Sequence, residues 1–179
     1  PLPISASSHH DSQLFIRLSG AGDAVKTAAE TIGGGMLPDD TDHWYKLKEQ
    51  QLDFFDKAPS VWRLSIGSDT PTAITGDHDT LYEWGGALRW IAGDVDSDSL
   101  RASAQDAGGH ISLFRSAQHV ASTREIFHPL PAGLLKIHRN LKQAFDPGNI
   151  LNPGKLYPEQ DTQDQRLQEQ STREQNTQA

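Results

Sequence analysis

The sequence predicts an α+β fold in which helices cover one face of an antiparallel sheet. Several short segments alternate apolar and other residues, as half-buried strands do. Segments with helical spacing of apolar residues separate them, and glycines mark the breaks between elements. The chain has 179 residues, which is enough for a domain with a substantial core.

The first part of the chain contains one predicted strand and two predicted helices. Residues 14–19 read Leu-Phe-Ile-Arg-Leu-Ser, and their alternation predicts a strand. Asp23 can cap a helix over residues 23–32, which the Gly-Gly-Gly run at 33–35 ends. A second helix is predicted over 41–55, with its large apolar residues on one side.

The remaining elements follow the order strand, hairpin, helix, strand, helix. Residues 61–66 alternate as a strand does, and the Gly-Gly pair at 85–86 between two apolar runs is typical of a two-residue hairpin turn. The later predicted elements are a helix over 98–107, a strand over 110–115 and a helix over 132–145. This order matches the split β-α-β-β-α-β pattern with additions, so we expect a ferredoxin-like sheet.

Alternation also sorts the strand residues into two faces. The residues expected to face the helices are Leu14, Ile16, Leu18, Trp62, Leu64, Ile66, Leu88, Trp90, Ile111 and Leu113. Those expected on the opposite face are Phe15, Arg17, Arg63, Ser65, Glu83, Arg89, His110, Ser112 and Phe114. Arginines, a glutamate and a histidine on one face indicate a candidate site. The alternative is an ordinary solvated face with cross-strand Arg–Glu pairs.

The last folded segment is a shaped loop. Residues 145–158 read Phe-Asp-Pro-Gly-Asn-Ile-Leu-Asn-Pro-Gly-Lys-Leu-Tyr-Pro. Two Pro-Gly pairs favour a rigid loop, although a helix stop at a chain end is the simpler alternative. Residues 159–179 are Gln-rich and carry a single large apolar residue, Leu167, so we predict a disordered tail there. We therefore expect a domain over 1–158 and a polar tail over 159–179.

Composition and spacing argue against several kinds of site. A net charge of −8 and a pI of about 5.4 argue against nucleic-acid binding. The sequence has no Cys, which excludes disulfides and thiolate metal sites. The acidic run at 94–98 lacks the Gly and Glu that a calcium loop needs at Ser99 and Gln105, so we predict no metal site. Gly20 and Gly22 imitate a dinucleotide-binding turn, but Val25 stands where its third Gly belongs.

Several motifs carry a family resemblance. Residues 83–90 read Glu-Trp-Gly-Gly-Ala-Leu-Arg-Trp, 108–115 read Gly-Gly-His-Ile-Ser-Leu-Phe-Arg, and 127–131 read Phe-His-Pro-Leu-Pro. The loop at 145–158 resembles the C-terminal signature of FAD-linked oxidases of the vanillyl-alcohol oxidase type. Together the motifs resemble the C-terminal domain of the FAD-binding subunit of bacterial glycolate oxidases. The resemblance implies a ferredoxin-like substrate domain that covers the reactive side of the flavin.

The resemblance implies FAD-dependent oxidation of glycolate, a small 2-hydroxy acid, to glyoxylate. Arg63 and Arg89 are candidates to hold the substrate carboxylate, since a guanidinium can donate two parallel hydrogen bonds to it. His110 is the candidate base for the hydroxyl proton. The residues expected to contact the cofactor are Asn152, Lys155 and Trp84.

The resemblance also implies partners. FAD is expected to be held mainly by a domain outside this chain, the N-terminal FAD-binding domain of the same subunit, so we expect the chain alone to be inactive. A catalytic flavoprotein subunit and an iron–sulfur subunit are the other implied partners. The expected location is the cytoplasm, or the periphery of the inner membrane through the complex. Two alternatives stay open: a structural domain that assembles the complex, and an unrelated ferredoxin-like module that binds a small molecule.

Overall fold

The computed structural model describes residues 1–38, 42–116, 126–155 and 157. It divides into two compact units, Pro1–His119 and Val120–Ala179, and each is described by itself. The predicted tail at 159–179 and the predicted domain boundary at Pro158 lie outside the described residues.

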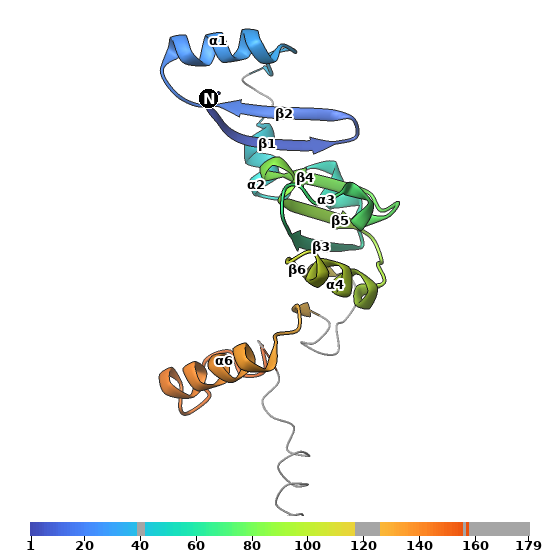
Figure 1. Cartoon of the computed structure of the whole chain (residues 1–179), viewed down its shortest axis with the longest axis vertical. Helices are drawn as coiled ribbons and strands as arrows, with labels where there is room; N and C mark the ends of the chain where they lie inside the picture. The colour runs from blue at the N-terminus through green and yellow to red at the C-terminus, as the bar shows by residue number, and fades with distance from the viewer. Residues whose placement is uncertain (39–41, 117–125, 156, 158–179) are drawn as a thin grey trace, which may run out of the picture. The chain divides into compact units, whose positions relative to one another are not determined.

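The first unit is built on a six-stranded sheet in the order β2-β1-β4-β5-β3-β6 (Figure 1). Every pair of neighbouring strands is antiparallel. The strands are β1 (Ile4–His10), β2 (Gln13–Leu18), β3 (Ser60–Ser65), β4 (Thr80–Glu83), β5 (Leu88–Ala92) and β6 (His110–Ser116). The predicted α+β fold is confirmed.

The helices lie close to their predicted positions. They are α1 (Gly22–Ile32), α2 (His43–Lys48), α3 (Asp53–Lys57), α4 (Ser97–Asp106) and α6 (Ala132–Phe145), with 3-10 turns η1 (Thr72–Thr75) and η2 (Trp84–Gly86). The single helix predicted over 41–55 is two short helices, because Gln50 between them has a left-handed φ of 56° that no helix accommodates. None of the helices in the described part of the chain has the length and apolar character needed to cross a membrane.

Four strands form the split pattern expected from the sequence. The connection from β3 to β4 passes over β5, and the connection from β5 to β6 passes over β3. A helix, α4, occupies the second crossover, whereas the first carries only η1. The β1–β2 hairpin extends the sheet beyond β4, as Figure 1 shows. Sequence alternation missed β1 because this strand has one large apolar residue, Ile4.

The connection between β4 and β5 is longer than predicted. Glu83 pairs with Leu88, so the turn spans residues 84–87 instead of the Gly-Gly pair alone. Trp84, Gly85 and Gly86 all have positive φ, which lets the chain reverse direction within η2.

Helices cover both faces of the sheet, whereas the sequence predicted one covered face. One core cluster joins β3, β4 and β5 to α2 and α3: Leu47, Phe54, Phe55, Val61, Leu81, Leu88 and Trp90. The other joins β3, β5 and β6 to α4: Trp62, Leu64, Ile66, Ile91, Leu100, Ala104 and Ile111. Val61 and Trp62 are consecutive in β3, so the clusters lie on opposite sides. We call these sides the α2–α3 face and the α4 face.

The strand pairing also corrects the prediction of which face each β5 residue points to. Arg89 lies opposite Leu64 and therefore shares the α4 face, whereas Trp90 lies opposite Arg63 on the α2–α3 face. Leu88 joins Trp90 there, against the sequence prediction for both residues. The alternation of β5 was uninformative because the strand is buried on both sides from Leu88 to Ile91.

We expect a Leu64→Ala substitution to destabilise the first unit strongly. Leu64 is 0% exposed in the middle of the α4 face, so truncation loses apolar burial and leaves a cavity. The free energy of unfolding should fall by about 2–5 kcal/mol in urea denaturation. Leu14→Ala is the matched control, because Leu14 is 61% exposed on β2 and its truncation should change stability by less than about 0.5 kcal/mol. Equal losses in the two variants would contradict this placement of the core.

Candidate functional site

The polar residues predicted for one face do gather there, with one exception. Phe15, Ser8, Glu83, Leu88, Ser65 and His110 form a row across the α2–α3 face from β2 to β6. In the next row Arg63 lies between Trp90 and Ser112. Arg17 reaches over the ring of Trp44 on α2, and Phe114 contacts Trp90 edge-on. Arg89 is the exception.

Glu83, Trp90 and Arg63 form an interacting group at the centre of this face. The indole Nε1 of Trp90 donates a hydrogen bond of 2.5 Å to Glu83 Oε1. The guanidinium carbon of Arg63 lies 6.0 Å from the centroid of the Trp90 ring, in cation–π range. Burial raises the pKa of Glu83, while the bond from Trp90 and the charge of Arg63 act in the opposite direction. The bond from Trp90 therefore holds this carboxyl in place, but the two favourable interactions offset only part of the cost of burying its charge.

Arg63 and His110 provide the open part of the face. Ser112 lies directly opposite Arg63, and His110 lies opposite Ser65, so Arg63 and His110 are diagonal neighbours. Such neighbours are typically about 7–8 Å apart at their Cα atoms, within reach of long side chains. Arg63 is partly exposed and His110 exposed, so a small anion could contact both.

The glycine before His110 fixes where β6 begins. A Cβ on Gly109 would come within 2.4 Å of the Ser65 carbonyl oxygen, so only glycine fits this approach between β6 and β3. The pairing then places His110 opposite Ser65. The second glycine of the Gly-Gly-His motif thus has a packing reason.

Arg89 is separated from Arg63 by the sheet. The residue is 1% exposed, and its guanidinium donates from Nε to Gly86 O at 3.0 Å, from Nη1 to Pro71 O at 2.9 Å, and from Nη2 to Thr70 O. Burial lowers its pKa. The prediction that Arg89 lies on the same face as Arg63 is wrong, because Arg89 pairs with Leu64 and points to the α4 face.

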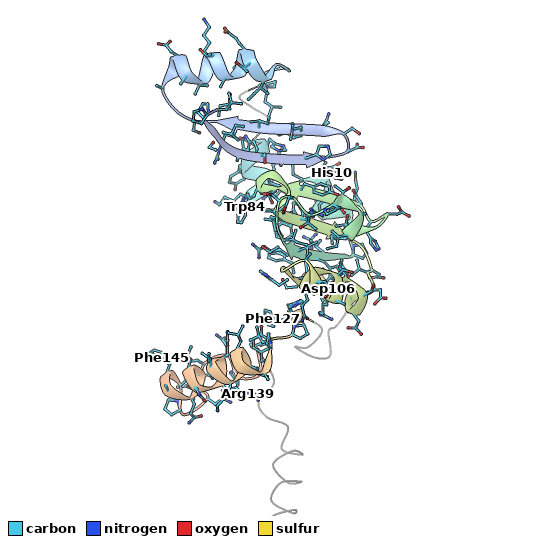
Figure 2. The ribbon with its side chains drawn as sticks, viewed as in Figure 1. His10, Trp84, Asp106, Phe127, Arg139 and Phe145 are labelled. Carbon is cyan, nitrogen blue, oxygen red and sulfur yellow. The ribbon has the colours of Figure 1, made fainter. Side chains whose placement is uncertain are left out.

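Trp84 lies in the turn between β4 and β5, where Figure 2 labels it. Its side chain is 62% exposed, in contrast to Trp62 and Trp90 at 7%. The backbone N–H of Gly85 donates to Ser7 Oγ at 2.9 Å, which ties this turn to β1. The turn presents a large aromatic surface to solvent.

In the second unit, Asp146 organises the loop that follows α6. Its carboxylate is 5% exposed and accepts hydrogen bonds from Ile150 N at 3.0 Å and Leu151 N at 2.9 Å. Lys142 Nζ contacts the same carboxylate and donates to Leu151 O at 2.5 Å. The bond from Lys142 is the main cause that lowers the pKa of Asp146. A single aspartate after a helix, which sequence reasoning passed over, thus holds the loop in shape.

The predicted cofactor residues Asn152 and Lys155 belong to this loop. Both are exposed, and Lys155 N donates to Asn152 O at 3.1 Å. Asn152 has a left-handed φ of 47°, which asparagine tolerates better than most residues. Their role toward a cofactor stays a prediction.

Comparison with known proteins supports the resemblance seen in the sequence. Residues 129–156, which contain the whole of α6 and the loop built on Asp146, match the family of FAD linked oxidases, C-terminal domain. Over 160 residues the chain is 39% identical to the glycolate oxidase subunit GlcE of Escherichia coli (strain K12). The resemblance to the FAD-linked oxidases is confirmed. The alignment covers 89% of this chain and 43% of GlcE, so the chain spans less than half of that relative. No solved structure gives a significant match.

The residues of this chain fit the ring of a flavin better than its phosphates. Trp84 offers an exposed aromatic face, and aromatic rings stack well on planar heterocycles. Phosphates need clustered backbone N–H groups, typically at a glycine-rich turn into a helix. The turn into α1 has Val25 in place of the third glycine of that motif.

We expect Glu83→Gln to change how stability depends on pH. A carboxyl whose pKa is raised on folding stabilises the native state below its unfolded pKa and loses that contribution as pH rises through the folded pKa. Gln keeps an acceptor for Trp90 without the charge. Urea denaturation at a series of pH values should show that the free energy of unfolding of Glu83→Gln rises relative to that of the wild type as pH rises from acidic to neutral. A difference that does not change with pH would contradict the raised pKa.

We also expect Asp146→Asn to loosen the terminal loop. The neutral amide loses the ion pair with Lys142 and offers one acceptor oxygen for two backbone N–H groups. Hydrogen exchange at Ile150 and Leu151 should speed up roughly tenfold, the effect of losing one hydrogen bond to a charged group. Asp106→Asn, at an exposed position on α4, is the matched control and should leave these amides unchanged. Equal exchange in both variants would show that Asp146 does not hold the loop.

Proposed function

We propose that the chain is the C-terminal, flavin-covering domain of a glycolate oxidase FAD-binding subunit. In this role it takes part in the FAD-dependent oxidation of glycolate to glyoxylate. The observation that carries the proposal is the 39% identity to the glycolate oxidase subunit GlcE along 89% of this chain. The match of the α6 segment to the FAD-linked oxidase C-terminal domain supports it.

The polar residues of the α2–α3 face supply the substrate contacts in this proposal. Arg63 would hold the glycolate carboxylate by parallel charge-assisted hydrogen bonds. His110, its exposed diagonal neighbour, would accept the hydroxyl proton as the substrate O–H bond breaks. When bound, FAD supplies the acceptor for the hydride that leaves C2.

Most of the FAD site would lie in an N-terminal FAD-binding domain of the same subunit. Trp84, Asn152 and Lys155 are the residues of this chain proposed to contact the cofactor. A catalytic flavoprotein subunit and an iron–sulfur subunit are the further proposed partners, in the cytoplasm or at the periphery of the inner membrane.

One observation favours a second role, the assembly of the complex. Apolar side chains on α6 recur at helical spacing and stay exposed, as do two in the following loop: Leu134, Ile137, Leu141, Phe145, Ile150 and Leu151. Figure 2 labels Phe145 at the end of this helix. Exposed apolar residues grouped in this way often mark protein–protein contacts.

An Arg63→Ala substitution in the assembled oxidase separates the two roles. Loss of hydrogen bonds to a charged carboxylate should lower kcat/KM for glycolate by about 10- to 100-fold, with flavin content and assembly unchanged. Arg63→Lys should recover part of the activity, because it restores the charge without the two-point contact. Turnover is measured as glycolate-dependent reduction of an electron-accepting dye.

Arg17→Ala is the matched control. Arg17 lies on the same face of the sheet, but on β2, the edge strand farthest from the β6 strand that carries His110. It should leave kcat/KM unchanged. Full turnover in Arg63→Ala with normal assembly would refute the substrate role of the face and leave the assembly role. An oxidase that contains this chain and binds no flavin would refute the proposed function.

A further inference from the structure

The turn between β4 and β5 places a bulky residue in a costly backbone conformation. Trp84, Gly85 and Gly86 have φ values of 53°, 62° and 91°. Glycine adopts such angles freely, whereas a tryptophan there brings its Cβ against the neighbouring carbonyl. Such a conformation persists only where the surroundings enforce it.

Hydrogen bonds from two elements enforce the turn. Ser7 Oγ on β1 accepts the Gly85 N–H at 2.9 Å, and Arg89 Nε on β5 donates to Gly86 O at 3.0 Å. The other guanidinium nitrogens of Arg89 donate to Thr70 O and Pro71 O, in the loop that leads from β3 into η1. The fork of one buried arginine therefore fixes the turn and this loop together, which a lysine cannot do.

The Trp84 side chain carried by this turn adds little to the core. The side chain of Trp84 is 62% exposed, while Trp62 and Trp90 on the adjacent strands are 7% exposed and packed. Ser7 and the buried Arg89 thus hold the backbone of a turn whose aromatic side chain faces solvent. Strain of this kind concentrates at ligand clamps, where a contact must be ready before the ligand arrives.

We infer that Ser7 and Arg89 are positioning residues that hold Trp84 as a fixed stacking platform for a planar aromatic ligand. The identity of that ligand rests on the proposed function, which makes it the flavin ring. An indole is electron-rich and an oxidised flavin electron-poor, so offset stacking of the two rings is favourable. Arg89 acts through the turn and does not contact the substrate carboxylate.

Hydrogen exchange of the Gly85 amide in the 179-residue chain tests the positioning. Ser7→Ala removes the acceptor of this amide and should speed its exchange by roughly 2- to 10-fold. Ser5→Ala on the same strand is the matched control, because Ser5 bonds to β2 and not to the turn. Arg89→Lys should also speed the exchange. If Arg89→Lys does not fold, Ser7→Ala still decides. Unchanged exchange in Ser7→Ala would overturn the inference.

The emission of bound flavin in the assembled oxidase tests the platform. A stacked indole quenches flavin fluorescence, so Trp84→Ala should raise the emission per bound flavin several-fold. Trp84→Phe should raise it less than Trp84→Ala, since the flat ring remains while the electron-rich indole is lost. Ser7→Ala should give a partial increase, a response that the loss of a merely structural bond would not produce. Flavin content is measured in each variant.

The outcomes separate this inference from the proposed function. Normal flavin content with unchanged emission in Trp84→Ala would overturn the platform and leave the proposed function standing. An oxidase that contains this chain and carries no flavin would overturn both, because the assigned ring would be absent.

Discussion

The burial of β3 and β5 on both faces is the constraint on which the rest of the structure depends. Apolar side chains from α2 and α3 fill one side and those from α4 fill the other. Burying a charged group on these strands is therefore costly unless a partner satisfies it. Arg89 on β5 meets this condition with backbone carbonyls, and the neighbouring strand β4 contributes Glu83, whose carboxylate accepts from the Trp90 indole. The groups left for a ligand lie toward β6 and at the β4–β5 turn.

Sequence patterns predicted the helices and strands more accurately than they predicted which side chains pack together. Alternation placed Arg63 and His110 on one face correctly, because Leu64 and Ile111 mark the opposite side of β3 and β6 as the more apolar one. Glu83 lies on the same face as predicted, although it shares its side of β4 with the buried Leu81. The same rule misplaced Arg89, because β5 is buried on both sides and its alternation has no preferred phase. Nothing in the sequence indicated that distant carbonyls at Thr70 and Pro71 would bind its guanidinium, which is a property of the tertiary fold.

The terminal loop shows the same division between local and tertiary information. Two Pro-Gly pairs predicted a shaped backbone, and the structure has one. The determining contacts are those of Asp146 with the Ile150 and Leu151 amides and with Lys142 on the preceding helix turn. These contacts leave Ile150 and Leu151 exposed, together with the apolar side of α6. Rigidity and exposure together suit a surface that meets another protein or a cofactor domain.

The central claim is that a small 2-hydroxy acid binds where β3 and β6 present Arg63 and His110. Oxalate tests it directly, because this two-carbon dicarboxylate has the size of glycolate and no hydroxyl to oxidise. In the assembled oxidase, oxalate should slow hydrogen exchange of amides near His110 and Ser112, and Arg63→Ala should abolish that protection. Protection confined to other parts of the oxidase, or protection near His110 that persists in Arg63→Ala, would contradict the claim.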